Sequence, residues 1–384
     1  MTDVYDYSDR IGRVEPSATL AISNLAAEKE AEGADIVDLS VGEPDFDTPA
    51  NVVEAGKAAL DAGHTGYTSS NGIPALREGI AEKLRGQGVD ATAEEVIVTP
   101  GGKQALYETI GTLIDDGDEV VLLDPAWVSY EAMVKLAGGA LSRVDLAPHG
   151  FQLEPALDDL AEAVSDDTAL LVVNSPSNPT GAVFSETALE GVRDLAVEHD
   201  VAVISDEIYG QIVYDADHVA LASLDGMDDR TVTINGFSKA YSMTGWRLGY
   251  LHATEAFVSQ AGKLHSHSVS CATNFVQHAG VEALEHTDEA VEEMRQAFAD
   301  RRDLLVDLFD EHDVDVDVGE GAFYMMIPVD DDDEAWCERA IEEASVACVP
   351  GAAFNAPGFA RISYAASEER LREAVDRLVT NDLL

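Results

Sequence analysis

Lysine is scarce in this sequence of 384 residues, and so are long apolar runs. Seven lysines and 16 arginines stand against 74 acidic residues, which gives a formal net charge of -51. A polyanion requires a basic surface that this composition cannot supply, so we expect no nucleic-acid partner. No apolar run reaches about 18 residues, and the start of the chain lacks the basic and apolar regions of a secretory signal. We therefore expect no membrane partner and predict a cytoplasmic protein.

Cysteine is equally scarce, and the three cysteines form no recognisable ligand or disulfide pattern. Cys271, Cys337 and Cys348 are an odd number without CxxC spacing. This argues against a disulfide framework and a structural zinc site, so we interpret them as small core residues. His265 and His267 lack a third ligand and are interpreted as surface or interface residues. We predict no metal site.

The acidic residues are spread through every segment instead of forming one tail. This excess of acidic over basic residues resembles proteins from organisms with molar cytoplasmic salt. The mutual repulsion of the acidic residues would be screened there, because the Debye length is about 3 Å at 1 M salt. We therefore expect a halophilic protein whose stability depends on salt. The densest acidic run, "DDDDE" at 330–334, is interpreted as a solvated loop in preference to a cation site.

Apolar runs of strand length alternate with amphipathic stretches between residues 46 and 285, which predicts an α/β fold. Strands that are apolar throughout belong in a sheet covered on both sides, so we expect one large domain with a mainly parallel sheet flanked by helices. After residue 286 a long helical pattern leads into short strands at "DVDVDV", "AFYMMIP" and "FARISYA". We predict a smaller α+β domain from residues 286–384, joined by residues 1–45.

Four of the predicted strands end in polar or glycine-rich motifs. These are "TPGGKQ", "NSPSNPTG", "SDEIY" and "NGFSK". Ligands of such sheets bind at the carboxyl ends of the strands, so we expect the four motifs to form one cleft. The glycines of "GGKQ" open a helix, whose N-terminal N–H groups suit an anion such as phosphate, although a glycine pair can also be a simple turn.

The residue types in this cleft suit one cofactor. Lys239 offers an amine, and Arg247, eight residues later, suits bidentate phosphate binding. Asp206 ends an apolar strand, and Tyr209 follows three residues later. Singly, the aspartate could be a helix N-cap and the tyrosine a core aromatic. Together with the lysine they match pyridoxal phosphate, which needs a Schiff-base lysine, an anion for its ring nitrogen, donors for its phenolate oxygen and a phosphate cradle.

The stretch "GFSKAYSMTGWRLG" is similar to the pyridoxal-phosphate lysine signature of class I aminotransferases of fold type I. The resemblance extends from "PSAT" at 16–19 to "RISYA" at 361–365 and is strongest to the prokaryotic aspartate aminotransferases. It implies that Lys239 forms the Schiff base and shuttles the proton, and that Asp206 pairs with the ring nitrogen. It also implies a homodimer with shared active sites, in which Tyr67 reaches the phosphate of the neighbouring subunit.

The same resemblance assigns the remaining cofactor and substrate contacts. Tyr209 and Asn178 match the groups that bond the phenolate oxygen, and Trp127 matches the aromatic that stacks on the ring. Arg361 matches the arginine that grips the substrate α-carboxylate, near the backbone of Gly42. Gly102, Lys103 and Arg247 fall where the family holds phosphate, and Asn178 and Trp127 also border the substrate.

Substrate choice depends on Lys103, which matches a lysine that relatives of this branch place near the distal carboxylate of aspartate or glutamate. The alternative is a lysine at a helix start that serves only the phosphate region. We predict transfer of the amino group from aspartate to 2-oxoglutarate by ping-pong kinetics. Aromatic or alanine transamination is the nearest alternative, and a lyase, a decarboxylase or a non-catalytic binding protein on this fold stays open.

Two departures from the family pattern concern the walls of the pocket. Gly236 stands where many relatives place a serine on the phosphate, and Ala126 stands where close relatives often have an aromatic residue. We include Ser238, adjacent to the lysine, among the cofactor-binding residues. Which hydroxyl replaces the missing phosphate contact stays open.

Overall fold

The computed structural model describes residues 5–329 and 332–384. Its largest sheet has seven strands in the order β2-β8-β7-β6-β5-β3-β4, and only β8 runs antiparallel to its neighbours. This confirms the predicted α/β fold with a mainly parallel sheet. The strands are β2 (Val96–Thr99), β3 (Glu119–Asp124), β4 (Ala140–Asp145), β5 (Thr168–Asn174), β6 (Ala202–Asp206), β7 (Thr231–Gly236) and β8 (Gly249–His252).

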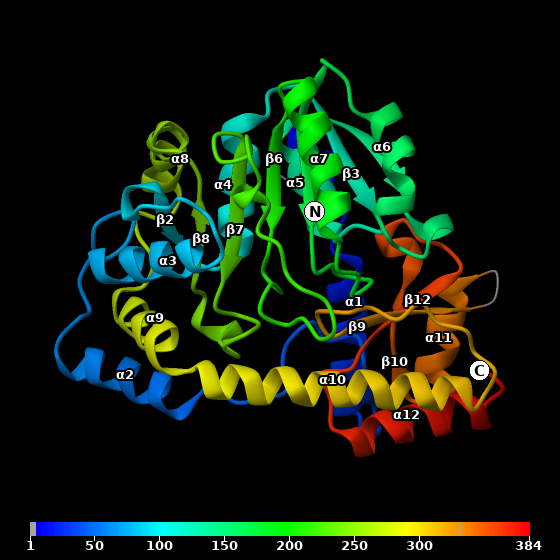
Figure 1. Ribbon diagram of the computed structural model, residues 1–384. Helices are drawn as coiled ribbons and strands as arrows, with labels where there is room; N and C mark the ends of the chain where they lie inside the picture. Colours follow the sequence, from blue (N-terminus) through cyan, green and yellow to red (C-terminus); the bar gives the residue numbers. More distant parts are fainter. Residues whose placement is uncertain (1–4, 330–331) are drawn as a thin grey trace.

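Both faces of this sheet are buried, because each central strand is apolar along its length. In β3, Val120 and Leu122 belong to one core cluster, whereas Val121 and Leu123 belong to another. Successive side chains of a strand point to opposite faces, so two separate helix layers are required to cover them. Helices α4, α5 and α8 supply the first layer, and α6 and α7 supply the second. Figure 1 shows these helices around the sheet.

The helices follow the amphipathic pattern of the sequence, and several begin at a capping side chain. Ser185 accepts a hydrogen bond from the backbone of Ala188 at the start of α7, an arrangement that stabilises helix N-termini. The bounds are α1 (Ala18–Ala31), α2 (Ala50–Asp61), α3 (Pro74–Gly86), α4 (Gly102–Leu113), α5 (Val128–Ala137), α6 (Leu157–Ala163), α7 (Glu186–Glu198), α8 (Glu255–Ser268), α9 (Asn274–His286), α10 (Asp288–Asp310), α11 (Asp333–Glu343) and α12 (Glu368–Thr380).

Two smaller sheets lie beside the large one. One is antiparallel, with the strand order β11 (Val349–Pro350), β12 (Phe359–Ser363) and β9 (Tyr324–Pro328). The other is a parallel pair of β1 (Val37–Asp38) and β10 (Val346–Ala347). The strand predicted at "DVDVDV" is wrong, because residues 313–318 contain no strand. Its three aspartates disfavour a strand, and alternation alone misled the prediction. The boundaries 46–285, 1–45 and 286–384 stay a prediction.

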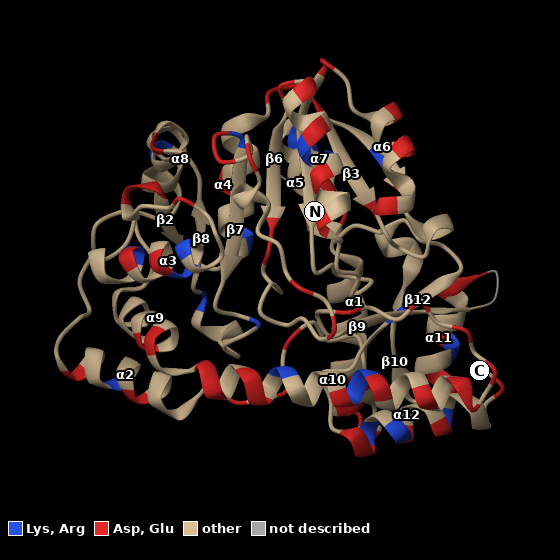
Figure 2. Cartoon of the chain, in the orientation of Figure 1, with Lys and Arg blue, Asp and Glu red and all other residues tan. Residues whose placement is uncertain are grey.

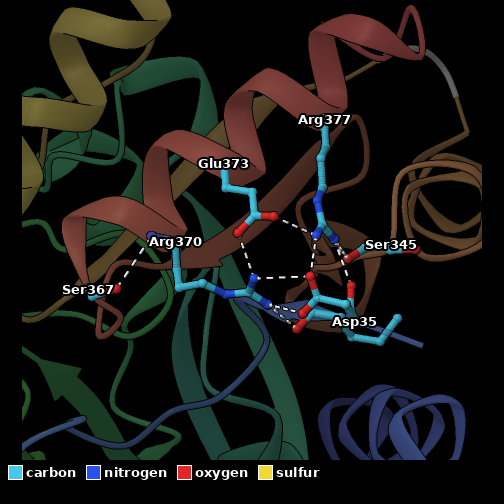
Figure 3. Close-up of polar contacts among 7 residues, drawn as sticks. Asp35, Ser345, Ser367, Arg370, Glu373 and Arg377 are labelled. Carbon is cyan, nitrogen blue, oxygen red and sulfur yellow. Dashed lines mark hydrogen bonds and ion pairs between the residues drawn. The ribbon is translucent and has the colours of Figure 1, made fainter. Parts of the chain in front are cut away.

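An ion-pair cluster ties the segment before β1 to α12 (Figure 3). Asp35 accepts from Arg370 at 3.0 Å and from Arg377 at 2.6 Å, and Glu373 accepts from both arginines at 2.6 Å. The two guanidinium groups lower the pKa of Asp35. The cluster also anchors the backbone, since Arg370 donates to the carbonyl of Ile36. It therefore holds the start of the chain that leads through β1 to Gly42.

Helix α10 spans 23 residues and runs from the side of α2 and α9 to α12 (Figure 1). Two of its arginines form ion pairs with aspartates in loops elsewhere in the chain. Arg301 makes a bidentate contact with Asp45, at 2.6 and 2.9 Å, and Arg302 donates to Asp215 at 2.9 Å. The helix thus braces the segment that follows Gly42 against the rest of the molecule.

Several predictions outside the cleft are settled by burial. Cys337 and Cys348 are buried free cysteines, as predicted, whereas Cys271 is only partly buried. The interpretation of His265 as a surface or interface residue is wrong, because its side chain is fully buried and lies 2.9 Å from the Glu108 carboxylate. The sequence shows no sign of this partner, which lies on α4, 157 residues earlier.

The acidic run at 330–334 lies only partly within the described residues. Asp332 caps α11 by accepting from Ala335, and Asp333 is buried and accepts from Ala352 at 2.6 Å. For Asp333 the predicted solvated loop is therefore wrong, whereas Asp332 is exposed and lies in the loop before the helix, as predicted. Residues 330 and 331 lie outside the described residues. Within the described ranges, no cluster of three or more His, Cys, Asp or Glu side chains could hold a metal ion, and no helix is both long and apolar enough to cross a bilayer.

Candidate active site

A cavity of about 580 Å³ opens where the strands β5, β6 and β7 end. Its lining is drawn from the large sheet, from the antiparallel sheet and from the chain before α2, so segments more than 300 residues apart in the sequence meet there. The structure brings together every predicted site residue except Tyr67. Those that line the cavity are Gly42, Gly102, Lys103, Trp127, Asn178, Asp206, Tyr209, Ser238, Lys239, Arg247 and Arg361.

Tyr67 lies outside the cavity lining and is 90% exposed. Among the described residues it is the most exposed of the large apolar and aromatic side chains. The exposure suits the expectation that it reaches a second subunit, and that role stays a prediction.

Lys239 follows β7 and projects into the cavity, where its amine donates to the carbonyl oxygen of Gly42. Burial lowers the pKa of this amine to about 8. The nearby Glu43 carboxylate opposes this shift, whereas Arg361 and Arg247 add to it. A buried amine with a lowered pKa is the form that nucleophilic and proton-transfer chemistry requires near neutral pH.

Asp206 is the last residue of β6, and its carboxylate is 3% exposed. It accepts from the Tyr130 hydroxyl at 2.7 Å and from the backbone N–H of Ile208 at 3.2 Å. Burial raises the pKa of Asp206 to about 6, and the two hydrogen bonds act in the opposite direction. No helix begins here, since residues 208–211 form a turn, so the helix N-cap alternative is wrong. Because a buried carboxylate needs a cationic partner or further hydrogen bonds, this position suits a ligand that presents a cation or an N–H group.

The N-terminus of α4 and Arg247 form an anion cradle at one end of the cavity. Gly101 has φ +86°, and a Cβ there would lie 2.5 Å from Nη2 of Arg247. Only glycine therefore lets the guanidinium approach this turn. Arg247 itself has φ +56°. The free N–H groups of a helix start and an adjacent guanidinium together suit a phosphate.

Lys103 lies on the first turn of α4, with its amine 4.6 Å from the ring centre of Trp127. Burial lowers the pKa of Lys103, and the neighbouring Arg247 lowers it further. Two cations in one half of the cavity create a field that favours an anionic ligand.

Arg361 lies on β12 with its side chain buried, far from most of the other site residues in the sequence. It donates to Oδ1 of Asn178 at 3.0 Å and to the carbonyl of Ser40. Its Nε atom is buried and makes no hydrogen bond within the described part of the chain. A buried guanidinium with an unused donor calls for an anionic acceptor, and a carboxylate matches its geometry.

The sequence interpretation missed four residues that line the cavity or hold the site. Tyr130 and Asn174 fix Asp206, the second by donating to its backbone carbonyl at 2.9 Å. Tyr324 bonds Tyr209, and Glu43 acts on Lys239. Tyr130 could have been found from its spacing three residues after Trp127. Tyr324 gives no such signal, because it comes 115 residues after its partner.

The residues present fit pyridoxal phosphate. The cavity holds an amine on Lys239, a buried carboxylate on Asp206, and an anion cradle at Gly101 with Arg247. The orphaned Nε of Arg361 leaves a second anion site for a substrate carboxylate. These are the groups that the cofactor and an amino acid require together.

Comparisons with known proteins agree with this geometry. Residues 34–378 match the family "Aminotransferase class I and II". The chain is 42% identical over 378 residues to the aspartate/prephenate aminotransferase of Thermus thermophilus, covering 96% of this chain and 97% of that protein. It is 40% identical over 373 residues to the aspartate aminotransferase of Thermotoga maritima, covering 97% and 98%.

Solved structures give the same result. The aspartate aminotransferase from Thermus thermophilus with maleate superposes with a TM-score of 0.95 at 41% identity, covering 98% of this chain and all of that one. An aromatic aminotransferase from Pyrococcus horikoshii OT3 superposes with a TM-score of 0.88, also at 41% identity, covering 94% of this chain and all of that one.

Proposed function

This chain belongs to the class I and II aminotransferases, and from that premise we propose that it transfers an amino group from L-aspartate to 2-oxoglutarate, using pyridoxal phosphate. The observation that carries the proposal is the meeting of Lys239, Asp206 and Arg361 in one cavity. An amine, a buried carboxylate and a carboxylate-binding guanidinium are the minimum for this reaction. The first half-reaction gives oxaloacetate, and the second gives glutamate.

Pyridoxal phosphate supplies an electron-withdrawing ring that stabilises negative charge on the carbon bearing the amino group. Asp206 would pair with the ring nitrogen, and Tyr209 and Asn178 would donate to the phenolate oxygen. Trp127 would lie against the ring face. The N-terminus of α4 at Gly102, with Arg247, would hold the phosphate, and Ser238 and Lys103 border the same region.

The chain's own groups then position and deprotonate the substrate. Arg361 binds the α-carboxylate through its free Nε face, which orients the α-hydrogen toward Lys239. The Lys239 amine, whose pKa is lowered to about 8 by burial, would take that proton from the α-carbon and deliver it to the carbon on the other side of the substrate nitrogen. The contact with the Gly42 carbonyl holds the amine in the cavity until the ligand arrives.

Lys103 supports a dicarboxylic substrate. Its amine lies in the cavity beside Trp127 and would pair with the distal carboxylate of aspartate or glutamate. Two relatives are named aspartate/prephenate aminotransferases, and one solved relative is an aromatic aminotransferase. Aromatic 2-oxo acids and prephenate are therefore the second candidate class of acceptor.

We also propose a cytoplasmic homodimer with shared active sites, adapted to high salt. The exposed Tyr67 supports the shared site, and the net charge of -51 supports the salt adaptation. Sedimentation of the purified protein in molar salt would test the dimer.

An absorbance spectrum tests the cofactor and the reaction together. Purified protein in molar salt should show a visible cofactor band that aspartate removes and 2-oxoglutarate restores. Lys239→Ala should lose both the band and turnover. Lys57→Ala is the matched control, because Lys57 lies on the surface and pairs with Glu54. A band and turnover that survive Lys239→Ala would contradict the assignment. Release of pyruvate and ammonia, or of carbon dioxide, without an acceptor would indicate a lyase or a decarboxylase instead.

Lys103→Met tests the substrate assignment. We expect the KM for aspartate to rise roughly tenfold, because one charge-assisted contact is lost. The KM for phenylalanine should change less than about twofold, since that substrate has no distal carboxylate. Equal losses for both substrates would show that Lys103 serves only the phosphate region.

A further inference from the structure

Tyr324 has no assigned role, although it lies at the centre of the site. It is on β9, in the antiparallel sheet, with its side chain 1% exposed. Its hydroxyl is 2.8 Å from the hydroxyl of Tyr209. A Cβ built on Gly42 would lie 2.9 Å from the same hydroxyl, so Tyr324 also lies against the segment that accepts from Lys239. One buried phenol thus contacts two segments of the proposed cofactor site.

In the contact between the two hydroxyl groups, either Tyr209 or Tyr324 can be the donor. A phenol donates one hydrogen and can accept another. If Tyr209 donates into the cavity, its oxygen is free to accept from Tyr324. The reverse arrangement would use the only hydrogen of Tyr209 and leave none for a ligand. An anionic acceptor in the cavity favours the first arrangement, because charge-assisted hydrogen bonds are about twice as strong as neutral ones.

We propose that Tyr324 is a positioning residue that directs the Tyr209 hydrogen toward the phenolate oxygen of pyridoxal phosphate. The inference rests on the proposed function and deepens it. A donor that also accepts a hydrogen bond is polarised and donates more strongly. Tyr324 therefore strengthens the contact between Tyr209 and the cofactor without touching the reacting atoms.

The ring of Tyr324 has a second contact that is separable from its hydroxyl. The guanidinium carbon of Arg361 lies 4.7 Å from the ring centre. Replacement by phenylalanine keeps this ring and removes only the hydroxyl. The charged groups that face the tyrosine pair are Arg361, Asp206 and Lys239, the last 5.7 Å from the Tyr209 ring centre. All three are unchanged in the phenylalanine variant.

The test compares the pH dependence of cofactor absorbance in Tyr324→Phe and wild type. A weaker hydrogen bond from Tyr209 makes the phenolate of the bound cofactor less stable. The cofactor therefore keeps its proton up to a higher pH. We expect the absorbance midpoint to rise by roughly 0.5 pH unit. The dissociation constant of maleate should stay within about twofold, because the ring beneath Arg361 remains. The matched control is Tyr364→Phe, a buried tyrosine whose hydroxyl contacts Tyr214 and Ala322 instead.

A double mutant separates positioning from general packing. If Tyr324 acts through Tyr209, adding Tyr324→Phe to Tyr209→Phe should shift the midpoint no further. An unchanged midpoint in Tyr324→Phe, the same shift in Tyr364→Phe, or additive shifts in the double mutant would each overturn the inference. Failure of the proposed function is distinct, because the wild-type protein would then show no cofactor band at all.

Discussion

At Lys239 the lowered pKa arises chiefly from burial, and charged neighbours modify it in both directions. The Glu43 carboxylate raises the pKa, and two arginines in the cavity lower it. Below about pH 8 the amine of the cofactor-free protein is mostly protonated and cannot attack a carbonyl. Above that pH it is mostly neutral and reactive.

We therefore expect the rate at which the cofactor-free protein captures pyridoxal phosphate to rise through pH 8 and then level off. In Glu43→Gln the midpoint of this rise should move to lower pH, by roughly half a unit, because the carboxylate that favours the charged amine is gone. Stopped-flow absorbance over a pH series measures this. Asp47→Asn, a nearby acidic residue that does not line the cavity, is the control. A midpoint that moves upward in Glu43→Gln would contradict the electrostatic account.

Individual site residues were predictable where a local motif carried them. Lys239 and Asp206 each lie at the end of a predicted strand, so their convergence could be inferred from topology, whereas Trp127 was assigned only through the family resemblance. Arg361 could be assigned only through the family resemblance, because a strand arginine has many ordinary uses. Tyr324 escaped prediction, since its importance lies in one hydroxyl that meets Tyr209 across 115 residues.

At the scale of elements, the start of α4 depends on one glycine with a positive φ. In Gly101→Ala the new Cβ would meet the Arg247 guanidinium at 2.5 Å, so the side chain must move away from the anion cradle. We expect the affinity for pyridoxal phosphate to fall roughly tenfold, with a stability loss of about 1 kcal/mol from the strained backbone.

Gly117→Ala provides the matched control for this variant. Gly117 has φ +99°, but a Cβ there meets nothing within 4 Å. It should share the loss of thermal stability and keep the affinity for the cofactor. Equal affinity losses in both variants would show that backbone strain, and not the displaced guanidinium, weakens binding.

Strands were predicted well where they are apolar along their length, because a strand that is buried on both faces needs a continuous apolar run. The edge strand β4 was missed, since Ala140 and Asp145 are exposed and the segment carries Arg143. The strand β8 was missed because it has only four residues and begins at Gly249. The false strand at 313–318 shows the converse, in which alternation occurs without a partner strand.

For the whole molecule, repulsion between like charges is the dominant long-range contribution to the free energy of folding. Figure 2 shows acidic residues on the outer helices, with few basic ones on α6, α7 and α10 and a mixture of both on α12. With a net charge of -51, mutual repulsion destabilises the folded chain in dilute buffer, and salt screens it. We expect the midpoint temperature of unfolding to rise by roughly 5–10 °C between about 0.1 M and 2 M KCl.

Calorimetry in KCl measures this shift, and sucrose at equal osmolality is the control because it does not screen charge. An equal gain in sucrose, or an unchanged midpoint together with full activity in salt-free buffer, would contradict the salt adaptation.

The positive φ of Arg247 has a consequence for how this protein could be evolved in the laboratory. A non-glycine residue in the left-handed region gives up about 1 kcal/mol of folding free energy. A library selected only for heat resistance, without cofactor, would gain by accepting glycine or asparagine at this position. Each such survivor would lose the guanidinium that we propose binds the cofactor phosphate. Selection for robustness and selection for catalysis therefore pull in opposite directions at residue 247, and only a screen that rewards cofactor retention would preserve the arginine.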